Sequence, residues 1–288
     1  MGAVSLTTST AKYRRNYHPL LPSIFRTPYP YCYRCSLGQN PDTCGMDCFE
    51  YLKKMLRHEI NPDEVAAIII EPVLGEGGYA VPPADYLKEL RKLCTQYGIL
   101  LIADEVQTGF GRTGKWFACE HFGIIPDIMT IAKGIASGFP LSAIVSTKKI
   151  MSKWPPGAHG TTFGGNPVSC AAGSATIETI ISGRLLQNAA MVGNHALRKL
   201  KDMQKKYPVM GDVRGLGLMI GIEFIKKDRS PDREFLKRVL NKCYKEGLIL
   251  IECGIDKNII RFMPPLITTI KEMETALDIF EDAVAQSG

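Results

Sequence analysis

The sequence predicts an α/β protein with a mostly parallel sheet flanked by helices and a smaller C-terminal α+β domain. Between residues 65 and 146, short apolar runs typical of buried strands alternate with helical or turn-forming sequence. After Pro167 the pattern changes to long helical stretches that surround shorter strand-like runs. A chain of 288 residues is long enough for both domains and for a sizeable core.

The first part contains the segments from which we expect the parallel sheet. The expected strands are 65–71 (VAAIIIE), 99–104 (ILLIAD), 128–133 (IMTIAK) and 141–146 (LSAIVS). Apolar residues at helical spacing predict a helix over 83–97, which Gly98 would end.

The second part is expected to mix helices and strands. Helices are predicted over 169–181, 184–207, 232–246 and 270–285. Strands are predicted over 211–224, 248–252 and 259–262. We place the domain boundary near Ser182 and Gly183, which gives a large domain over 1–182 and a small domain over 183–288.

Charge and hydropathy restrict the partners that the protein is expected to have. The formal charge is +6, and the basic residues are scattered, which argues against nucleic acid as the main partner. No run approaches the ~18 apolar residues of a membrane helix, so we expect no membrane partner. The first residues, MGAVSLTTST, have neither a signal-peptide nor a myristoylation pattern. We therefore expect a cytoplasmic protein that binds small molecules.

Four of the nine cysteines are grouped as C-x2-C-x8-C-x3-C at Cys32, Cys35, Cys44 and Cys48. This spacing is compatible with a tetrahedral Zn²⁺ site, and equally with a loop of reduced or locally bridged cysteines. Because no histidine joins the set, we assign no metal ligands. The remaining cysteines are expected to be small buried residues: Cys94, Cys119, Cys170, Cys243 and Cys253.

Three successive apolar strands end in an ionisable residue, namely Glu71, Asp104 and Lys133. In open parallel sheets, ligands bind outside the carboxyl ends of the strands, and right-handed crossovers bring these ends to one edge. Taken alone, Lys133 could be a solvated lysine in a turn. Three such endings on neighbouring strands predict a polar site at this edge.

Several motifs in order make a specific resemblance. They are EPVLGEGG at 71–78, DEVQTG at 104–109, Lys133 in TIAKG, TTFGGNP at 161–167 and IRF at 260–262. Together they closely resemble the class III (ω-amino acid) aminotransferases, with 4-aminobutyrate aminotransferases as the nearest likeness. The resemblance covers essentially the whole chain. It implies a fold type I enzyme that uses pyridoxal 5'-phosphate (PLP) as cofactor.

The resemblance assigns the central chemistry to two residues. Lys133 would form the Schiff base with the cofactor, and would then move a proton as general base and acid. Asp104 would keep the ring nitrogen of the cofactor protonated, so that the ring can store electrons. For Asp104 the alternative interpretation is a helix N-cap.

Three further residues are expected to bind the cofactor. Val106 would pack on one face of the ring, and Gln107 would hydrogen-bond the ring's 3′ oxygen. Thr162 would bind the cofactor phosphate of the partner subunit through its hydroxyl. This last role implies a homodimer. Without the motifs, these would be a core residue, a surface residue and a turn residue.

The expected substrates are amino acids and 2-oxo acids. The guanidinium of Arg261 suits bidentate binding of a carboxylate. The alternative is an arginine in a strand whose charged end extends to solvent. Glu76 resembles the switch glutamate of the family. It would pair with Arg261 while an ω-amine is bound, and would move away when glutamate or 2-oxoglutarate needs the arginine. Glu71 would support the hydrogen-bond network around Gln107. The alternative is a structural role at the end of a strand.

We expect the chain to be N-terminally incomplete, because MGAVSLTTSTAKYR resembles an interior stretch of these enzymes. The absent part would contain the same-subunit phosphate site, so we expect weak PLP binding and poor turnover. The lead hypothesis is amino transfer from an ω-amino acid such as 4-aminobutyrate to 2-oxoglutarate. The alternatives are ornithine or acetylornithine transfer, amino-acid racemisation, or a non-catalytic module with the PLP fold.

Overall fold

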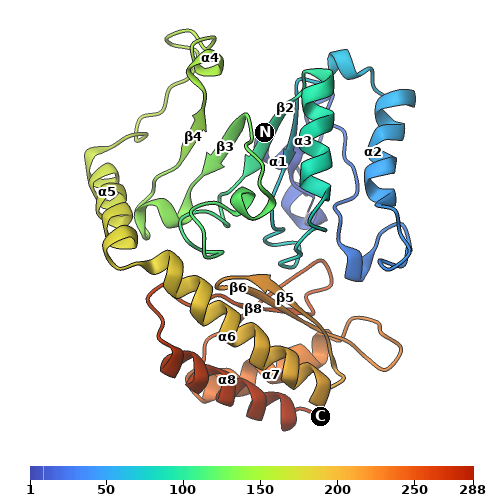
Figure 1. The fold of residues 1–288 in the computed structure, drawn as a ribbon, viewed down its shortest axis with the longest axis vertical. Coiled ribbons are helices and arrows are strands. Elements are labelled where there is room, and N and C mark those ends of the chain that lie inside the picture. Colours follow the sequence, from blue (N-terminus) through green and yellow to red (C-terminus); the bar gives the residue numbers. More distant parts are fainter. Residues whose placement is uncertain (9) are drawn as a thin grey trace.

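The chain folds around two β-sheets, one from each part of the sequence, in a computed structural model that describes residues 1–8 and 10–288 (Figure 1). The first sheet has the order β1-β2-β3-β4, from strands β1 (Ala67–Ile70), β2 (Leu100–Asp104), β3 (Ile128–Ile131) and β4 (Ala143–Ser146). The second has the order β5-β6-β8-β7, from strands β5 (Met210–Leu216), β6 (Met219–Phe224), β7 (Ile251–Cys253) and β8 (Ile259–Phe262).

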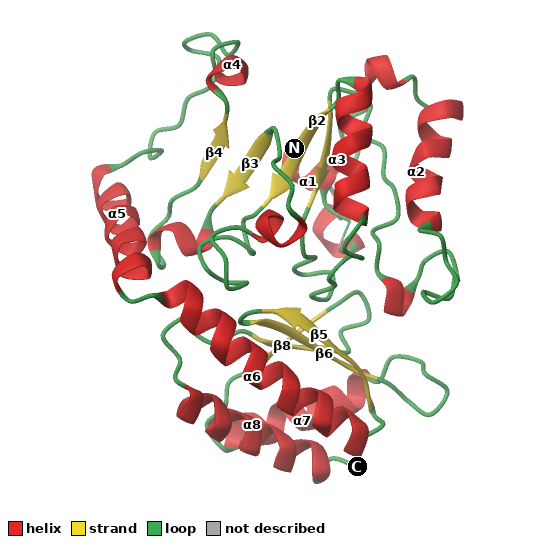
Figure 2. Ribbon diagram, in the orientation of Figure 1, coloured by secondary structure: helices red, strands yellow, loops and turns green. Residues whose placement is uncertain are grey.

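The helices pack beside the two sheets (Figure 2). The α-helices are α1 (Gly2–Leu6), α2 (Asp47–His58), α3 (Tyr86–Tyr97), α4 (Lys148–Met151), α5 (Pro167–Ser182), α6 (Leu185–Lys206), α7 (Arg233–Lys245) and α8 (Ile270–Ala285). Of these, α6, α7 and α8 lie on one side of the second sheet (Figure 2). Short 3-10 helices cover Ala11–Arg14, Cys32–Arg34, Pro62–Glu64, Ala118–Phe122 and Lys133–Ala136. None of the helices in the described part of the chain is long and apolar enough to cross a membrane.

The first sheet is mostly parallel, which confirms the predicted α/β class. β1 pairs with β2 and β2 with β3 in parallel, whereas β4 is antiparallel to β3. Ile70 lies opposite Ala103 and Asp104 opposite Thr130. This register brings the ends of β1, β2 and β3 to one edge of the sheet.

The helices α2 and α3 form one core with β2. The buried side chains of α3 recur at helical spacing, and Gly98 at φ 69° ends the helix in the left-handed conformation. Leu87 and Leu90 pack in the same cluster as Phe49 of α2 and Leu101 of β2. Fully burying each such side chain stabilises the fold by about 2 kcal/mol, which holds the edge of the sheet in place.

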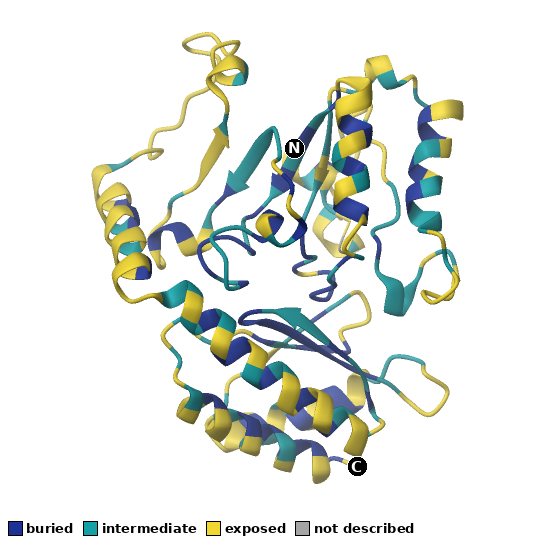
Figure 3. Ribbon diagram, viewed as in Figure 1, coloured by how far each residue is buried: buried dark blue, intermediate teal, exposed yellow. Residues whose placement is uncertain are grey.

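Strand β4 and helix α5 expose much of their apolar surface (Figure 3). Ile144 and Val145 point to opposite faces of β4, and each is 49% exposed. On α5, Ile181 is 63% exposed. Several exposed apolar side chains on neighbouring elements are typical of a region that packs against further protein.

The prediction of a single strand over 211–224 was wrong. The segment is a hairpin, in which β5 and β6 pair antiparallel with Leu216 opposite Met219. Gly217 makes the turn at φ 53°. A Cβ on this residue would collide with the backbone at Thr113, so the hairpin tip needs glycine to approach the first part of the chain.

Helices α6, α7 and α8 lie together on one face of the second sheet (Figure 1). Their buried side chains share one cluster with the strands, including Leu200 of α6, Leu236 of α7, Phe280 of α8 and Ile222 of β6. This layer leaves the other face of the second sheet directed toward the first part of the chain (Figure 1).

Arg112 joins the two parts of the chain. Its Nη1 donates hydrogen bonds to the carbonyl oxygens of Leu218 (3.2 Å) and Pro264 (2.6 Å). In return, the amide of Leu218 donates to the carbonyl of Arg112 at 3.0 Å. We propose to keep the domain division at Ser182 and Gly183, where α5 ends and the long helix α6 follows.

Candidate active site

Glu71, Asp104 and Lys133 lie at the shared carboxyl edge of the first sheet. Glu71 directly follows β1, Asp104 is the last residue of β2, and Lys133 opens a 3-10 helix after β3. Burial raises the pKa of Glu71, the charge of Asp104 raises it further, and the charge of Lys133 lowers it. The three groups are therefore close enough to influence one another, as the strand pattern predicted.

Lys133 itself is exposed and has a left-handed backbone with φ 45°. Such a conformation is uncommon for a residue with a side chain, and it is found disproportionately at functional sites. The glycine that follows has little free space, because a Cβ on Gly134 would lie 3.2 Å from Cβ of Phe110. The amine is thus open to a ligand while its backbone is packed closely.

Asp104 is held by a local turn. Its Oδ1 accepts a hydrogen bond of 3.1 Å from the amide of Val106, which is itself half-buried. This is an Asx-type turn and replaces the helix N-cap that was the alternative interpretation. Beside it in the ladder, Oγ1 of Thr130 is buried and has no hydrogen-bond partner among the described residues.

Gln107 is bound to a residue that the sequence did not single out. Its Nε2 donates to the hydroxyl of Tyr79 at 2.9 Å, and this hydroxyl donates to Sδ of Met263 at 2.9 Å. Tyr79 is fully buried, and burial raises the pKa of its phenol well above its usual range. The only signal for Tyr79 in the sequence was its position after the glycine-rich stretch GEGG.

Gly75 brings Glu71 and Gln107 together. Its amide donates a 2.7 Å hydrogen bond to Oε2 of Glu71, and a Cβ in its place would collide with Oε1 of Gln107. Glu71 therefore braces the glycine-rich turn and also borders Gln107. Both of its predicted roles, support of Gln107 and a strand end, agree with these contacts.

Glu76 and Arg261 form an ion pair between Oε1 and Nη1, although 185 positions separate them. The side chain of Arg261 is only 12% exposed, whereas that of Glu76 is 47% exposed. Nη2 of Arg261 donates to the carbonyl of Glu252 at 3.3 Å, and its buried Nε has no partner among the described residues. Burial opposes the charged form, but the carboxylate of Glu76 keeps the pKa of Arg261 raised.

Thr162 makes no hydrogen bond or ion pair with another predicted site residue in the part of the chain that the structure describes. It lies on the exposed loop between α4 and α5. A role toward the cofactor of a partner subunit therefore remains a proposal.

The residues at the edge fit a PLP molecule chemically. An exposed amine at Lys133 suits its aldehyde, and the carboxylate of Asp104 suits its protonated ring nitrogen. The amide of Gln107 and the unpartnered hydroxyl of Thr130 are groups that hydrogen-bond ring oxygens.

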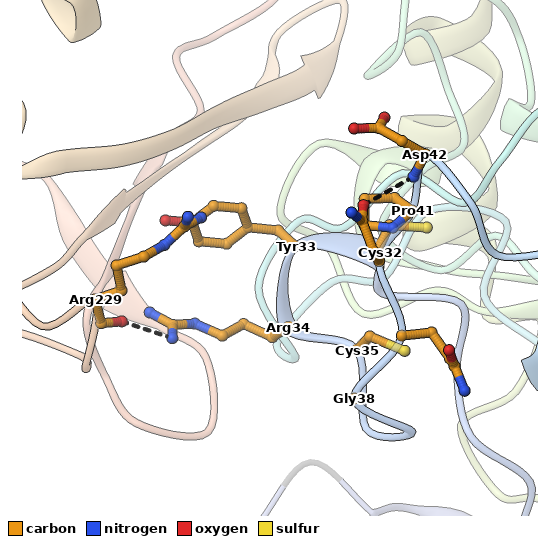
Figure 4. Close-up of a pocket in the computed structure, with 10 residues that line it drawn as sticks. Cys32, Tyr33, Arg34, Cys35, Gly38, Pro41, Asp42 and Arg229 are labelled. Atoms are coloured by element: carbon orange, nitrogen blue, oxygen red, sulfur yellow. Dashed lines mark hydrogen bonds between the residues drawn. The ribbon is translucent and has the colours of Figure 1, made fainter.

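Two of the grouped cysteines, Cys32 and Cys35, line a pocket that also contains Asp42 and Arg229 (Figure 4). Cys32, Cys35, Cys44 and Cys48 are all free and half-buried. Burial raises the pKa of Cys32, and the neighbouring Cys35 and Cys44 raise it further. Within residues 1–8 and 10–288, no three histidine, cysteine or acidic side chains are arranged to hold a metal ion.

The prediction that the other cysteines are buried was wrong for one of them. Cys94, Cys119, Cys243 and Cys253 are buried, but Cys170 is exposed. Cys170 lies on α5, whose apolar surface is largely uncovered in this chain.

The fold and this edge define a PLP-dependent enzyme of fold type I. The model of the family "Aminotransferase class-III" matches residues 1–284. The chain therefore belongs to the class III aminotransferases, whose cofactor is pyridoxal 5'-phosphate.

Relatives with different reactions match the chain at similar levels. It is 43% identical to an alanine/serine racemase of Pyrococcus horikoshii, over 99% of this chain and 61% of the relative. It is 40% identical to a 4-aminobutyrate aminotransferase of Mycobacterium leprae, over 96% of this chain and 62% of the relative. The chain thus spans about three fifths of the length of these relatives.

A solved structure agrees with this relationship. It is an amine transaminase from an uncultivated Pseudomonas species in the PLP-bound, internal aldimine form. The TM-score is 0.89 at 34% sequence identity, and the match covers 96% of this chain and 65% of that chain.

Proposed function

We propose that this chain provides the catalytic edge of an aminotransferase that moves an amino group from an ω-amino acid, such as 4-aminobutyrate, to 2-oxoglutarate or a similar 2-oxo acid. The observation that carries the proposal is the ion pair of Glu76 with Arg261, since the charges of Glu76, Asp104 and Lys133 all act on Glu71 at the same edge. The family membership and the 4-aminobutyrate aminotransferase among the relatives support it.

The ion pair favours a reaction with two unlike substrates. An ω-amine substrate has no carboxylate on the carbon that carries the amine, so a free arginine there would be left unpaired and partly buried. Glu76 neutralises Arg261 in that half of the reaction. Because Glu76 is half exposed, it can leave toward solvent when a 2-oxo acid brings its own carboxylate.

The residues at the edge divide the chemical work. When bound, PLP supplies an aldehyde that condenses with amines and a ring that accepts electrons. Nζ of Lys133 takes the proton from the amine-bearing carbon of the substrate and returns a proton in the reverse direction. Asp104 holds a proton on the ring nitrogen, because a unit ion pair at ~4 Å contributes ~4 kcal/mol at an effective dielectric constant of 20.

The remaining proposed roles concern binding. Nε2 of Gln107 donates to the ring oxygen, and Val106 packs against the ring. Thr162 donates its hydroxyl to the phosphate bound by a partner subunit, which makes a homodimer part of the proposal. The exposed apolar surface of β4 and α5 supports packing against further protein, and light scattering of the purified protein tests the dimer.

Reductive trapping tests the role of Lys133. The protein is incubated with PLP, reduced with borohydride and digested, and the peptides are then mapped by mass spectrometry. We expect the pyridoxyl group on Lys133 and its loss in Lys133→Ala, while the exposed Lys148→Ala control keeps it. An adduct that persists in Lys133→Ala would overturn the assignment.

Racemisation is the second candidate, because a racemase matches the chain as well as the aminotransferase does. A racemase acts on an α-amino acid throughout, so it has no step in which the arginine must be masked. With the complete protein, 4-aminobutyrate and L-alanine are compared as substrates. Transfer from 4-aminobutyrate to 2-oxoglutarate supports our proposal, and D-alanine without amino transfer supports the racemase.

A further inference from the structure

Arg214, on β5, holds the turn that carries Glu76. Its side chain is 11% exposed, and it donates two hydrogen bonds to the carbonyl oxygen of Gly78, from Nε at 3.1 Å and from Nη2 at 2.6 Å. Two donors of one guanidinium on a single carbonyl fix both the position and the direction of that peptide group.

The guanidinium is itself immobilised from the opposite side. Its Nη1 pairs with Asp212 at 2.6 Å and with Glu223 at 3.0 Å. Nη2 also bonds the hydroxyl of Tyr31, whose ring lies 4.7 Å from the guanidinium carbon. Glu223 is 1% exposed and also pairs with Arg34 at 2.6 Å, so one buried carboxylate holds two arginines.

The turn is also fixed at other points, because the amide of Gly75 donates to Oε2 of Glu71 at 2.7 Å and the amide of Tyr79 donates to the carbonyl of Gly75 at 3.2 Å. Within it, the amide of Gly78 donates to the carbonyl of Gly75 at 3.0 Å. The carbonyl of Glu76 accepts from the amide of Gly254 at 2.9 Å. Gly78 has φ 127°, which only glycine adopts readily, and a Cβ there would collide with Ile259. The Gly78 carbonyl is the point at which the side chain of Arg214 contributes to fixing the direction of this turn.

We propose that Arg214 is a positioning residue for the Glu76–Arg261 pair, acting through the Gly78 carbonyl, and that it thereby sets how well a substrate carboxylate competes with Glu76 for Arg261. Arg214 touches neither side chain of the pair. The inference rests on the proposed function of that pair, and it adds a determinant of substrate choice that lies on another strand.

A double-mutant cycle tests whether Arg214 affects carboxylate binding at Arg261 through Glu76. The probe is glutarate, a five-carbon dicarboxylate, titrated calorimetrically into the 288-residue chain in buffer that contains excess PLP. We expect Arg214→Met to tighten glutarate binding about two- to tenfold, since Glu76 then competes less well for Arg261. In the Glu76→Gln background, the same change is expected to have no effect. An equal shift in both backgrounds would show that Arg214 does not act through Glu76.

Amide hydrogen exchange gives a readout that needs no ligand. We expect Arg214→Met and Arg214→Lys to speed exchange in peptides that contain Gly78 and Gly254 by about tenfold or more. Arg214→Lys keeps a cation for Asp212 and Glu223, so it is expected to fold even if the methionine variant does not. The matched control is Arg91→Met, which removes a partly buried arginine ion pair (Arg91–Asp127, 2.6 Å) in the first part of the chain. Unchanged exchange in both Arg214 variants would overturn the proposal.

The variant Arg261→Gln distinguishes a failure of the proposed function from a failure of the positioning role of Arg214. If glutarate binds equally well to this variant, Arg261 is not the carboxylate site and the proposed function fails. The exchange rates of the Gly75–Tyr79 turn then still decide whether Arg214 positions it.

Discussion

Gln107 donates a 2.9 Å hydrogen bond from Nε2 to the hydroxyl oxygen of Tyr79. The same hydroxyl donates to Sδ of Met263, so a fully buried tyrosine links the proposed cofactor side to the strand that carries Arg261. The orientation of Gln107 thus depends on a residue that has no role in the motifs themselves.

Removing this hydroxyl should destabilise the protein. In Tyr79→Phe, Nε2 of Gln107 loses its 2.9 Å partner and keeps only the longer 3.8 Å contact to Sδ of Met263, and we expect the free energy of unfolding to fall by about 1–2 kcal/mol in urea titrations. The control is Tyr86→Phe, since Tyr86 is equally buried and the described residues make no hydrogen bond to its hydroxyl. Equal losses in the two variants would contradict the prediction.

Arg112→Met should weaken the junction between the two parts of the chain. It leaves the carbonyls of Leu218 and Pro264 without their donor, and we expect a loss of about 2–3 kcal/mol in the free energy of unfolding. The exposed Lys54→Met serves as control and should change stability by less than about 0.5 kcal/mol. A similar small effect in Arg112→Met would show that the junction does not depend on this side chain.

Glu71→Gln should change how stability depends on pH. Burial raises the pKa of Glu71 above its ordinary value of 4.5, so the folded protein binds this proton more tightly than the unfolded chain. The contribution of Glu71 to stability is therefore fully present below pH 4.5 and is lost as pH rises through the raised pKa. Glutamine retains an acceptor for the amide of Gly75 and does not titrate.

The measurement is the difference in unfolding free energy between Glu71→Gln and the unsubstituted protein from pH 4 to pH 8. We expect this difference to increase in favour of glutamine as pH rises and then to level off. The exposed Glu64→Gln is the control for replacing a carboxylate by an amide. A difference that falls with rising pH would mean that the direction of the pKa shift is wrong.

Thiol alkylation should distinguish exposed from buried cysteines. Burial raises the pKa of Cys243 to about 11 and that of Cys253 to about 12, whereas Cys170 is exposed. At pH 8 in the native state, we expect iodoacetamide to modify Cys170 on the order of a hundredfold or more faster than Cys253. Peptide mapping over time measures the rates, and equal rates would contradict the burial of Cys253.

The elements near the candidate site could be predicted well from local sequence. Short apolar runs identified β1, β2 and β3, and the helical spacing identified α3. The hairpin of β5 and β6 could not, because an alternating apolar pattern continues through Gly217 and a turn needs only one left-handed glycine. The antiparallel direction of β4 was equally hidden, since strand direction depends on the path of the connection and not on composition.

By itself, the sequence determined that three ionisable residues end successive strands, and thus that Glu71, Asp104 and Lys133 meet at one edge. This follows from the geometry of parallel sheets, which is a local and repetitive property. Only the tertiary structure decided which polar groups support them. Tyr79 reaches Gln107 across 28 positions, and Arg214 reaches the carbonyl of Gly78 across 136. Such hydrogen bonds need donor–acceptor distances that are correct to a few tenths of an ångström, together with suitable angles, between separately packed elements. No periodicity in the sequence encodes these distances and angles.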